Sequence, residues 1–180
     1  MFREGKPEGF FYLDHRTVDG KFNIITDTFV TPGNMNDSVP YLERLDRQIE
    51  RFEFEVDAVG LDAGYFPYAI NKGLCDRKIF GVIGSRSGKR RNECIGKPEF
   101  IYDAESDSFQ CPAGSRLVYQ ITGRDGYREY VSDQAICAHC GWKSMCIQNK
   151  DGRKTVRRHI WEKYREQIIA NGRTPKGKEI

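Results

Sequence analysis

An apolar stretch that ends on a carboxylate, residues 56–62 (VDAVGLD), limits the fold of this 180-residue chain more than any other feature. Its valines, alanine and leucine are typical of a short strand that is buried on both faces. Such a strand belongs in a parallel sheet covered by helices. Asp62, at its end, has two interpretations: it caps the short helix predicted to follow, or it binds a metal ion.

The segments before this strand predict a hairpin and a helix. Two β-rich runs, residues 9–18 and 21–31, flank Asp19-Gly20, a signal for a two-residue hairpin turn. Apolar residues then recur at spacings of three and four, which predicts an amphipathic helix over Leu42 to Phe52. The polar residues available to cap this helix are Asn36, Asp37 and Ser38.

The segments after the strand predict a helix over 66–74 and a second strand over 78–84. A helix between two strands indicates a parallel pair, so the fold class is α/β, with a mixed sheet formed by this pair and the hairpin. Residues 99–112 predict a small hairpin, followed by short strands and turns to about 150. A last helix is predicted from Arg157 to Asn171, before a basic tail.

Composition excludes a membrane protein and favours the cytoplasm. No run of about 18 apolar residues exists to span a bilayer, and the charged N-terminus has no apolar core like that of a secretory signal. The six cysteines are therefore expected to be reduced thiols or metal ligands rather than disulfides.

Four cysteines have the spacing of a zinc site. The C-x-x-C pair in CAHCGWKSMC lets two thiolates from one turn reach a tetrahedral ion, and two further cysteines complete the site. The set is Cys111, Cys137, Cys140 and Cys146. His139 is a possible substitute, but its neighbour Cys140 makes joint ligation difficult. The alternative is a group of unrelated reduced thiols. Because the segment has few large apolar residues, structural Zn²⁺ would supply folding energy.

Basic residues gather at two places, although the formal net charge is only +3. They are candidate contacts to DNA phosphates, and the alternative is a solvated charged surface. The candidates are Arg86, Lys89, Arg90 and Arg91, then Arg153, Lys154, Arg157 and Arg158.

Three segments in this order resemble the DDE-type transposases of bacterial insertion sequences. They are residues 12–42 with the motif VTPGNMNDS, residues 60–66 with the motif DAGY, and residues 100–117 followed by the C-x-x-C pair. The chain is most similar to the group with a cysteine-rich insertion in the catalytic domain, and the likeness runs from about residue 9 to about residue 161.

The resemblance implies an RNase H-like fold and metal-dependent cleavage and transfer of DNA strands in transposition. Two aspartates and one glutamate hold two Mg²⁺ or Mn²⁺ ions in this family. The Asp of D-A-G-Y is the second of the three, so Asp62 is identified as the catalytic carboxylate and cation ligand. The domains implied are a partial RNase H-like core over 1–84, the cysteine-rich insertion over 85–156, and a C-terminal helix with a basic tail over 157–180.

The other two carboxylates of the family have no match. Asp14, Asp19 and Asp27 do not occupy the place of the first aspartate, and Glu179 lacks the R-x-x-I-E-x-x-F context of the glutamate. The chain is therefore expected to be a piece truncated at both ends and inactive alone. Its sheet would lack the central strand, which would leave two strand edges open unless the missing segments or another transposase chain supplies it.

Two other functions are candidates for this sequence. One is a non-catalytic, zinc-stabilised DNA-binding module, for which DNA is again the partner. The other is a zinc-dependent hydrolase, which the sequence disfavours because four cysteines leave no open coordination position. The three histidines, His15, His139 and His159, also lack an H-E-x-x-H context.

Overall fold

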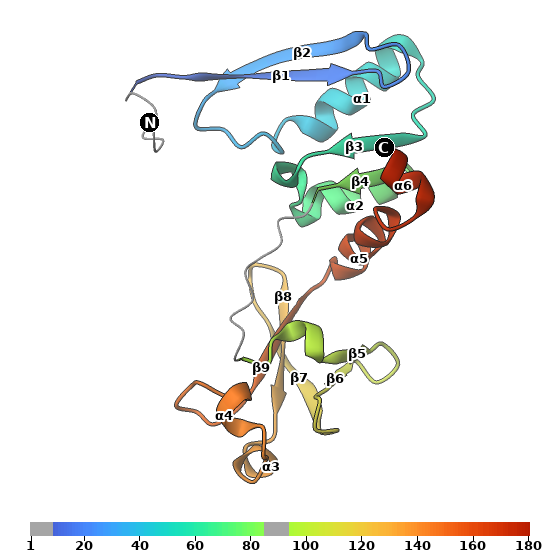
Figure 1. The fold of residues 1–180 in the computed structure, drawn as a ribbon. Helices are drawn as coiled ribbons and strands as arrows, with labels where there is room; N and C mark the ends of the chain where they lie inside the picture. The colour runs from blue at the N-terminus through green and yellow to red at the C-terminus, as the bar shows by residue number, and fades with distance from the viewer. Residues whose placement is uncertain (1–8, 85–93) are drawn as a thin grey trace. The chain divides into compact units, whose positions relative to one another are not determined.

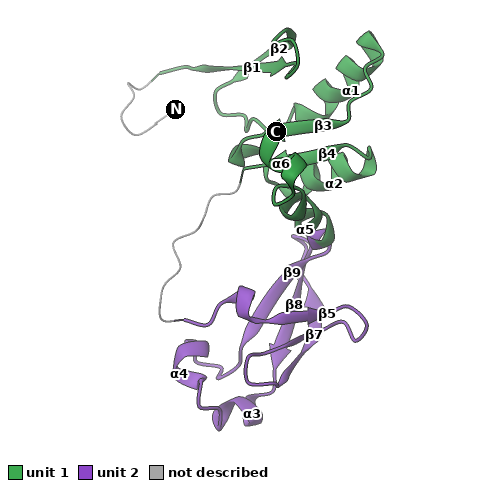
Figure 2. Cartoon of the chain, turned by 45° about the vertical axis from the view of Figure 1, so that its right-hand side comes forward, with its two compact units in different colours: residues 1–86, 163–180 green, residues 87–162 purple. Residues whose placement is uncertain are grey.

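The computed structural model describes residues 9–84 and 94–180 (Figure 1). The chain divides into two compact units (Figure 2). Residues 1–86 and 163–180 form unit 1, and residues 87–162 form unit 2. Within the described ranges, no helix has the length and apolar character that a bilayer crossing requires.

Unit 1 begins with an antiparallel hairpin of β1 (Tyr12–Val18) and β2 (Ile25–Pro32), as predicted. The predicted two-residue turn at Asp19-Gly20 is wrong, because the strands are joined by the longer loop 19–24. The Asp19 carboxylate accepts a hydrogen bond from Phe22 N at 2.7 Å, and Asn23 adopts the left-handed conformation with φ of 55°. Asp19 therefore starts the loop, and an asparagine four residues later takes the conformation that reverses the chain.

Helix α1 (Tyr41–Phe52) confirms the periodic apolar pattern. The predicted side-chain cap is wrong, since Pro40 occupies the N-cap position and no side chain caps the helix. Asn36 Oδ1 instead accepts from Ser38 N at 3.0 Å, which closes a local turn. On the hairpin side, Arg44 forms an ion pair with Asp27, while the helix buries Leu45 in the core.

Strands β3 (Ala58–Leu61) and β4 (Phe80–Ile83) form the parallel pair that the sequence predicts. The short 3₁₀ helix Ala63–Tyr65 and helix α2 (Tyr68–Asp76) connect them. The buried core of unit 1 draws on α1, α2, the parallel strands and the C-terminal helix: Leu45, Ile70, Leu74, Ile79, Ile83 and Ile168.

The hairpin and the parallel pair are two separate two-stranded sheets among the described residues. The α/β class is confirmed, but the single mixed sheet predicted from the sequence is not formed. Strands β1 and β3 each have a hydrogen-bonded neighbour on one side only within the described ranges, so each presents an open edge.

The C-terminal segment contains a strand that the sequence prediction missed. Residues 155–159 form β9 (Thr155–His159), so the predicted helix starts later, as α5 (Glu162–Asn171). In β9, Val156 is buried opposite Tyr130 and Arg157 is exposed, an alternation that suits an edge strand. The predicted unstructured tail includes α6 (Pro175–Glu179), whose first turn is capped by Thr174 Oγ.

Unit 2 is built on one antiparallel sheet in the order β5-β6-β7-β8-β9. Its strands are β5 (Ile101–Asp103), β6 (Ser108–Gln110), β7 (Arg116–Thr122), β8 (Tyr127–Ser132) and β9. A 3₁₀ helix (Lys97–Glu99) precedes β5, and α3 (Gln134–Ala138) and α4 (Lys143–Cys146) lie between β8 and β9. One face buries a small core: Phe100, Phe109, Leu117, Tyr130 and Val156.

Candidate functional site

Asp62 lies at the carboxyl end of β3, where the chain turns into the 3₁₀ helix. Its side chain is exposed, and Oδ1 accepts a hydrogen bond from Gly64 N at 2.7 Å. Gly84, just after β4, donates its N–H to Leu61 O at 2.9 Å and so holds the two strand ends together. The structure thus gives Asp62 the role of a helix cap while leaving its carboxylate accessible to solvent.

Aromatic residues and a second carboxylate surround this turn. Tyr41 and Tyr65 make an edge-to-face contact, with ring centroids 5.2 Å apart. Burial raises the pKa of Tyr65, and the nearby carboxylates of Asp37 and Asp62 raise it further. An exposed carboxylate oxygen is a suitable ligand for Mg²⁺. However, no group of three or more His, Cys, Asp or Glu side chains placed to hold a metal occurs in the described part of the chain.

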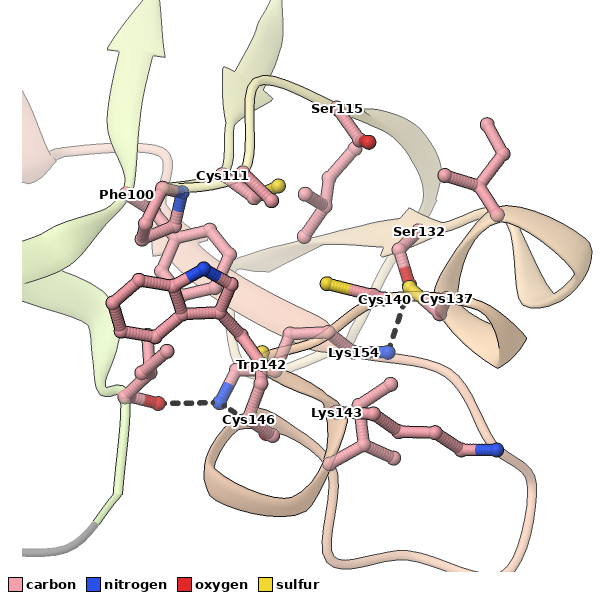
Figure 3. Close-up of a pocket in the computed structure, with 16 residues that line it drawn as sticks. Phe100, Cys111, Ser115, Ser132, Cys137, Cys140, Trp142, Lys143, Cys146 and Lys154 are labelled. Carbon is pink, nitrogen blue, oxygen red and sulfur yellow. Dashed lines mark hydrogen bonds between the residues drawn. The ribbon is translucent and has the colours of Figure 1, made fainter.

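The four predicted zinc ligands lie around one cavity in unit 2 (Figure 3). Cys111 follows β6, Cys137 is on α3, Cys140 follows that helix, and Cys146 ends α4. The cavity has a volume of about 30 Å³, and its wall also includes Phe100 and other apolar side chains. The four cysteines, up to 35 positions apart in the sequence, therefore line one small space. Among the described residues, however, no three of these thiols are arranged closely enough to hold a metal ion as they stand.

Local turns place the C-x-x-C pair. Asp133 caps α3 by accepting hydrogen bonds from Ala135 N at 2.7 Å and from Ile136 N at 3.2 Å. Cys140 N then donates to Cys137 O at 3.3 Å, which folds the pair into a single turn. This is the arrangement that lets two thiolates approach the same ion.

The electrostatics of Cys146 reflect the other three thiols. Burial raises the pKa of Cys146, the Lys154 ammonium lowers it, and Cys137, Cys111 and Cys140 raise it. The apolar cavity and the neighbouring thiols thus disfavour the thiolate form of Cys146 unless a cation compensates its charge. Zn²⁺ is the cation that four cysteine ligands typically select.

The remaining cysteines and His139 lie outside this group. All six cysteines are free thiols, and Cys75 and Cys94 do not line the cavity. Cys94 Sγ accepts from Gln148 Nε2, and burial raises the pKa of Cys75 in unit 1. His139 is exposed and is not part of the cavity wall. The four-cysteine set therefore fits the cavity better than a set that includes His139.

Of the candidate DNA contacts, Arg86, Lys89, Arg90 and Arg91 lie outside the described residues. Arg157 forms ion pairs with Asp125 at 2.6 Å and with Glu129 at 3.3 Å. Arg158 stacks on Tyr102, with its guanidinium carbon 4.1 Å from the ring centroid. Both arginines are thus engaged within unit 2.

The cysteine segment is similar to a known protein family. Residues 110–180 match a family model described as a transposase DDE domain, which supports the resemblance of the sequence to DDE-type transposases. No curated protein and no solved structure matched the chain. The match covers less than half of the 180 residues; it includes all four cavity cysteines and does not extend to Asp62.

Sequence reasoning missed Asp107 as a structural centre of unit 2. Its carboxylate accepts from Tyr130 Oη at 2.7 Å, from Tyr102 Oη at 2.8 Å and from Arg128 Nη1 at 3.2 Å. Asp107 has φ of 44°, a conformation that aspartate tolerates in tight turns. In the sequence, Asp107 is recognisable only as a turn residue of the predicted hairpin. That position does not predict its contacts with Tyr130 and Arg128 on β8.

The Asp107 cluster predicts acid sensitivity. Burial by itself raises the pKa of Asp107, but the hydrogen bonds from Tyr130 and Tyr102 and the charge of Arg128 together lower it below its usual value. A carboxyl group with a lowered folded-state pKa stabilises the fold above its unfolded pKa of about 3.9 and loses that contribution as the pH falls through the folded pKa.

Asp107→Asn is therefore expected to lower the free energy of unfolding by about 1–2 kcal/mol at pH 7, and by less as the pH falls below about 4. Urea unfolding of both proteins at pH 7, 5, 4 and 3, followed by tryptophan fluorescence, measures the difference. Both proteins carry the same cysteines, so thiol protonation affects them equally. A difference in the free energy of unfolding between the two proteins that stays constant down to pH 3 would contradict a stabilising role for the ionised Asp107 carboxylate.

Proposed function

We propose that this chain is part of a DDE transposase, whose activity is metal-dependent cleavage and transfer of DNA strands in an insertion sequence. The family match of residues 110–180 carries the proposal. Asp62 supports it, because the carboxyl end of a parallel strand is where α/β proteins gather site residues. Asp62 would supply an oxygen ligand to Mg²⁺ or Mn²⁺, which stabilises the attacking and leaving oxygens in phosphoryl transfer.

The order of elements in unit 1 supports an RNase H-like core as part of this proposal. A hairpin is followed by a helix, a strand, a helix and a strand, and the two strand pairs each present an open edge. A strand inserted between β1 and β3 would join the two pairs into one mixed sheet. Another segment of a transposase, or another transposase chain, would provide that strand and a further carboxylate.

We expect residues 1–180 by themselves not to cleave DNA, since a single carboxylate does not provide the several oxygen ligands that each metal needs. Incubation of supercoiled plasmid with the purified chain and Mn²⁺ should leave the plasmid intact. Asp62→Asn, which keeps the acceptor for Gly64 N, should behave in the same way, as should the control Asp57→Asn. Nicking by the wild type and the control that Asp62→Asn abolishes would show that the chain is already an active enzyme.

DNA binding is tested separately from cleavage. If the basic residues contact phosphates, affinity for duplex DNA should fall steeply with salt and depend little on sequence. Titrations between 50 and 200 mM salt compare the wild type with a variant in which Arg86, Lys89, Arg90 and Arg91 are changed to Gln. Equal and weak binding by both proteins at low salt would exclude these four residues as DNA contacts.

A non-catalytic zinc-stabilised DNA-binding module is the second candidate, and the convergence of four cysteines on one cavity favours its zinc site. Cys111, Cys137, Cys140 and Cys146 would hold Zn²⁺ as thiolates. A site closed by four cysteines contributes folding energy rather than catalysis. The zinc site is compatible with both candidates, and plasmid nicking distinguishes a transposase from a non-catalytic module.

A further inference from the structure

Lys154 ties together two separate segments beside the cysteine cavity. Its Nζ donates to Ile95 O at 2.7 Å and to Cys146 O at 3.0 Å. The side chain is half-buried and lines the cavity, and its ammonium lies 5.5 Å from the centroid of the Phe100 ring. One lysine therefore fixes the main chain at a cavity cysteine and the segment that leads into unit 2.

Ser132 makes a second connection from the sheet to the cysteines. It is buried at 6% exposure, and its Oγ accepts from Lys154 N at 2.9 Å. The Cys137 thiol donates to the same oxygen at 3.2 Å. When Cys137 loses its proton to bind a metal, the Ser132 hydroxyl has its own hydrogen available to donate to the thiolate.

The hydrogen bonds and the ammonium group of this network can offset the negative charge of a zinc-loaded site. One Zn²⁺ and four thiolates carry a net charge of −2, and the cavity wall around them is largely apolar. Charge in such surroundings is costly unless an opposite charge or a hydrogen bond offsets it. Lys154 places an ammonium at the wall of the cavity. Lys143 also lines the cavity, but its side chain extends away from the sulfur atoms (Figure 3).

We propose that Lys154 and Ser132 are positioning residues of the zinc site: Lys154 anchors the Cys146 main chain and offsets the negative charge of the site, and Ser132 orients the Cys137 sulfur. This inference rests on the proposed zinc site. Neither residue ligates the metal. Groups that hydrogen-bond to metal ligands commonly change metal affinity by about tenfold to a hundredfold when they are removed.

The test compares zinc affinities at one pH. Wild type, Lys154→Gln, Lys154→Arg, Ser132→Ala and the matched control Lys143→Gln are titrated with Zn²⁺ against a chromophoric chelator. Lys154→Gln is expected to weaken zinc binding about tenfold to a hundredfold and Ser132→Ala by about tenfold. Lys154→Arg, which keeps the charge, should recover most of the affinity, and Lys143→Gln should bind as the wild type does.

Cobalt substitution adds a spectroscopic measurement that a purely structural role would not change. Co²⁺ in four-sulfur sites gives intense thiolate-to-metal absorption, and Lys154→Gln and Ser132→Ala should shift these bands while Lys143→Gln leaves them unchanged. Affinities and bands equal to those of the wild type would overturn the roles of Lys154 and Ser132 while leaving the zinc site intact. If the wild type binds neither metal, the zinc site and this inference both fail. If Lys154→Gln does not fold, the zinc affinities and cobalt bands of Ser132→Ala and Lys154→Arg test the proposed roles.

Discussion

Removal of the proposed zinc ion from the purified chain is expected to unfold unit 2. The buried apolar core of this unit consists of five residues on one face of the sheet, and α3 and α4 are short helices that surround the cysteine cavity. Zinc binding to four-ligand sites contributes about 10–16 kcal/mol, which is comparable to the whole stability of a small domain. Both tryptophans, Trp142 and Trp161, lie in unit 2, so their fluorescence reports this unit selectively.

The experiment follows tryptophan fluorescence and metal content during titration with a strong chelator. A red shift of the emission should accompany zinc loss and reverse when zinc is restored. Cys140→Ser should give the emission of the zinc-free protein from the start. Cys75→Ser, a change of the same chemistry in unit 1, should bind zinc as the wild type does. Purified wild type that contains no zinc and keeps a blue-shifted emission in chelator would show that the cysteines are ordinary reduced thiols.

Ile168→Ala is expected to destabilise unit 1 by about 2–5 kcal/mol. Ile168 is 1% exposed on α5, and it packs against Leu74 and the main chain of Gly81 on β4. The backbone at Gly81 has no space for a side chain, because a Cβ there would lie 2.7 Å from Ile168 Cδ1. Truncation leaves a cavity at the position where the C-terminal helix meets the parallel strands.

The matched control is Ile25→Ala in the same unit. Because Ile25 is 50% exposed on the hairpin, this substitution should lower the free energy of unfolding by under about 1 kcal/mol. Urea unfolding followed by far-ultraviolet circular dichroism measures both variants. Equal midpoints for Ile168→Ala and Ile25→Ala would show that α5 does not stabilise unit 1. Asn171 Nδ2 also donates to Gly81 O at 3.0 Å, so α5 contacts β4 at a second point.

The four cysteines were predicted as zinc ligands from their spacing, because part of this chemistry is local. The C-x-x-C pair forms one turn whatever the rest of the fold does. The structure added that Cys111, which comes from a different hairpin, reaches the same cavity. The positioning residues Ser132 and Lys154 carry no spacing signal, because they approach the cysteines only through the pairing of β8 with β9.

Two local predictions failed where tertiary contacts compete with sequence preference. The helix predicted from Arg157 begins instead with the end of a strand, because β8 offers a backbone partner and a buried place for Val156. Asp19-Gly20 has the composition of a two-residue turn, but the Asp19 carboxylate bonds to Phe22 N and lengthens the loop. Both outcomes depend on hydrogen bonds that composition does not specify.

The sequence by itself determined the α/β class, the parallel pair of β3 and β4, and the position of Asp62 at a strand end, because these follow from local apolar patterns and from the helix between the strands. Only the tertiary structure decided that Asp62 caps a turn, that the hairpin and the parallel pair stay in separate sheets, and that four cysteines surround one cavity. The spacing of apolar residues along the sequence predicts which residues are buried. Which segments pack together is set by pairing and packing energies between residues far apart in the chain.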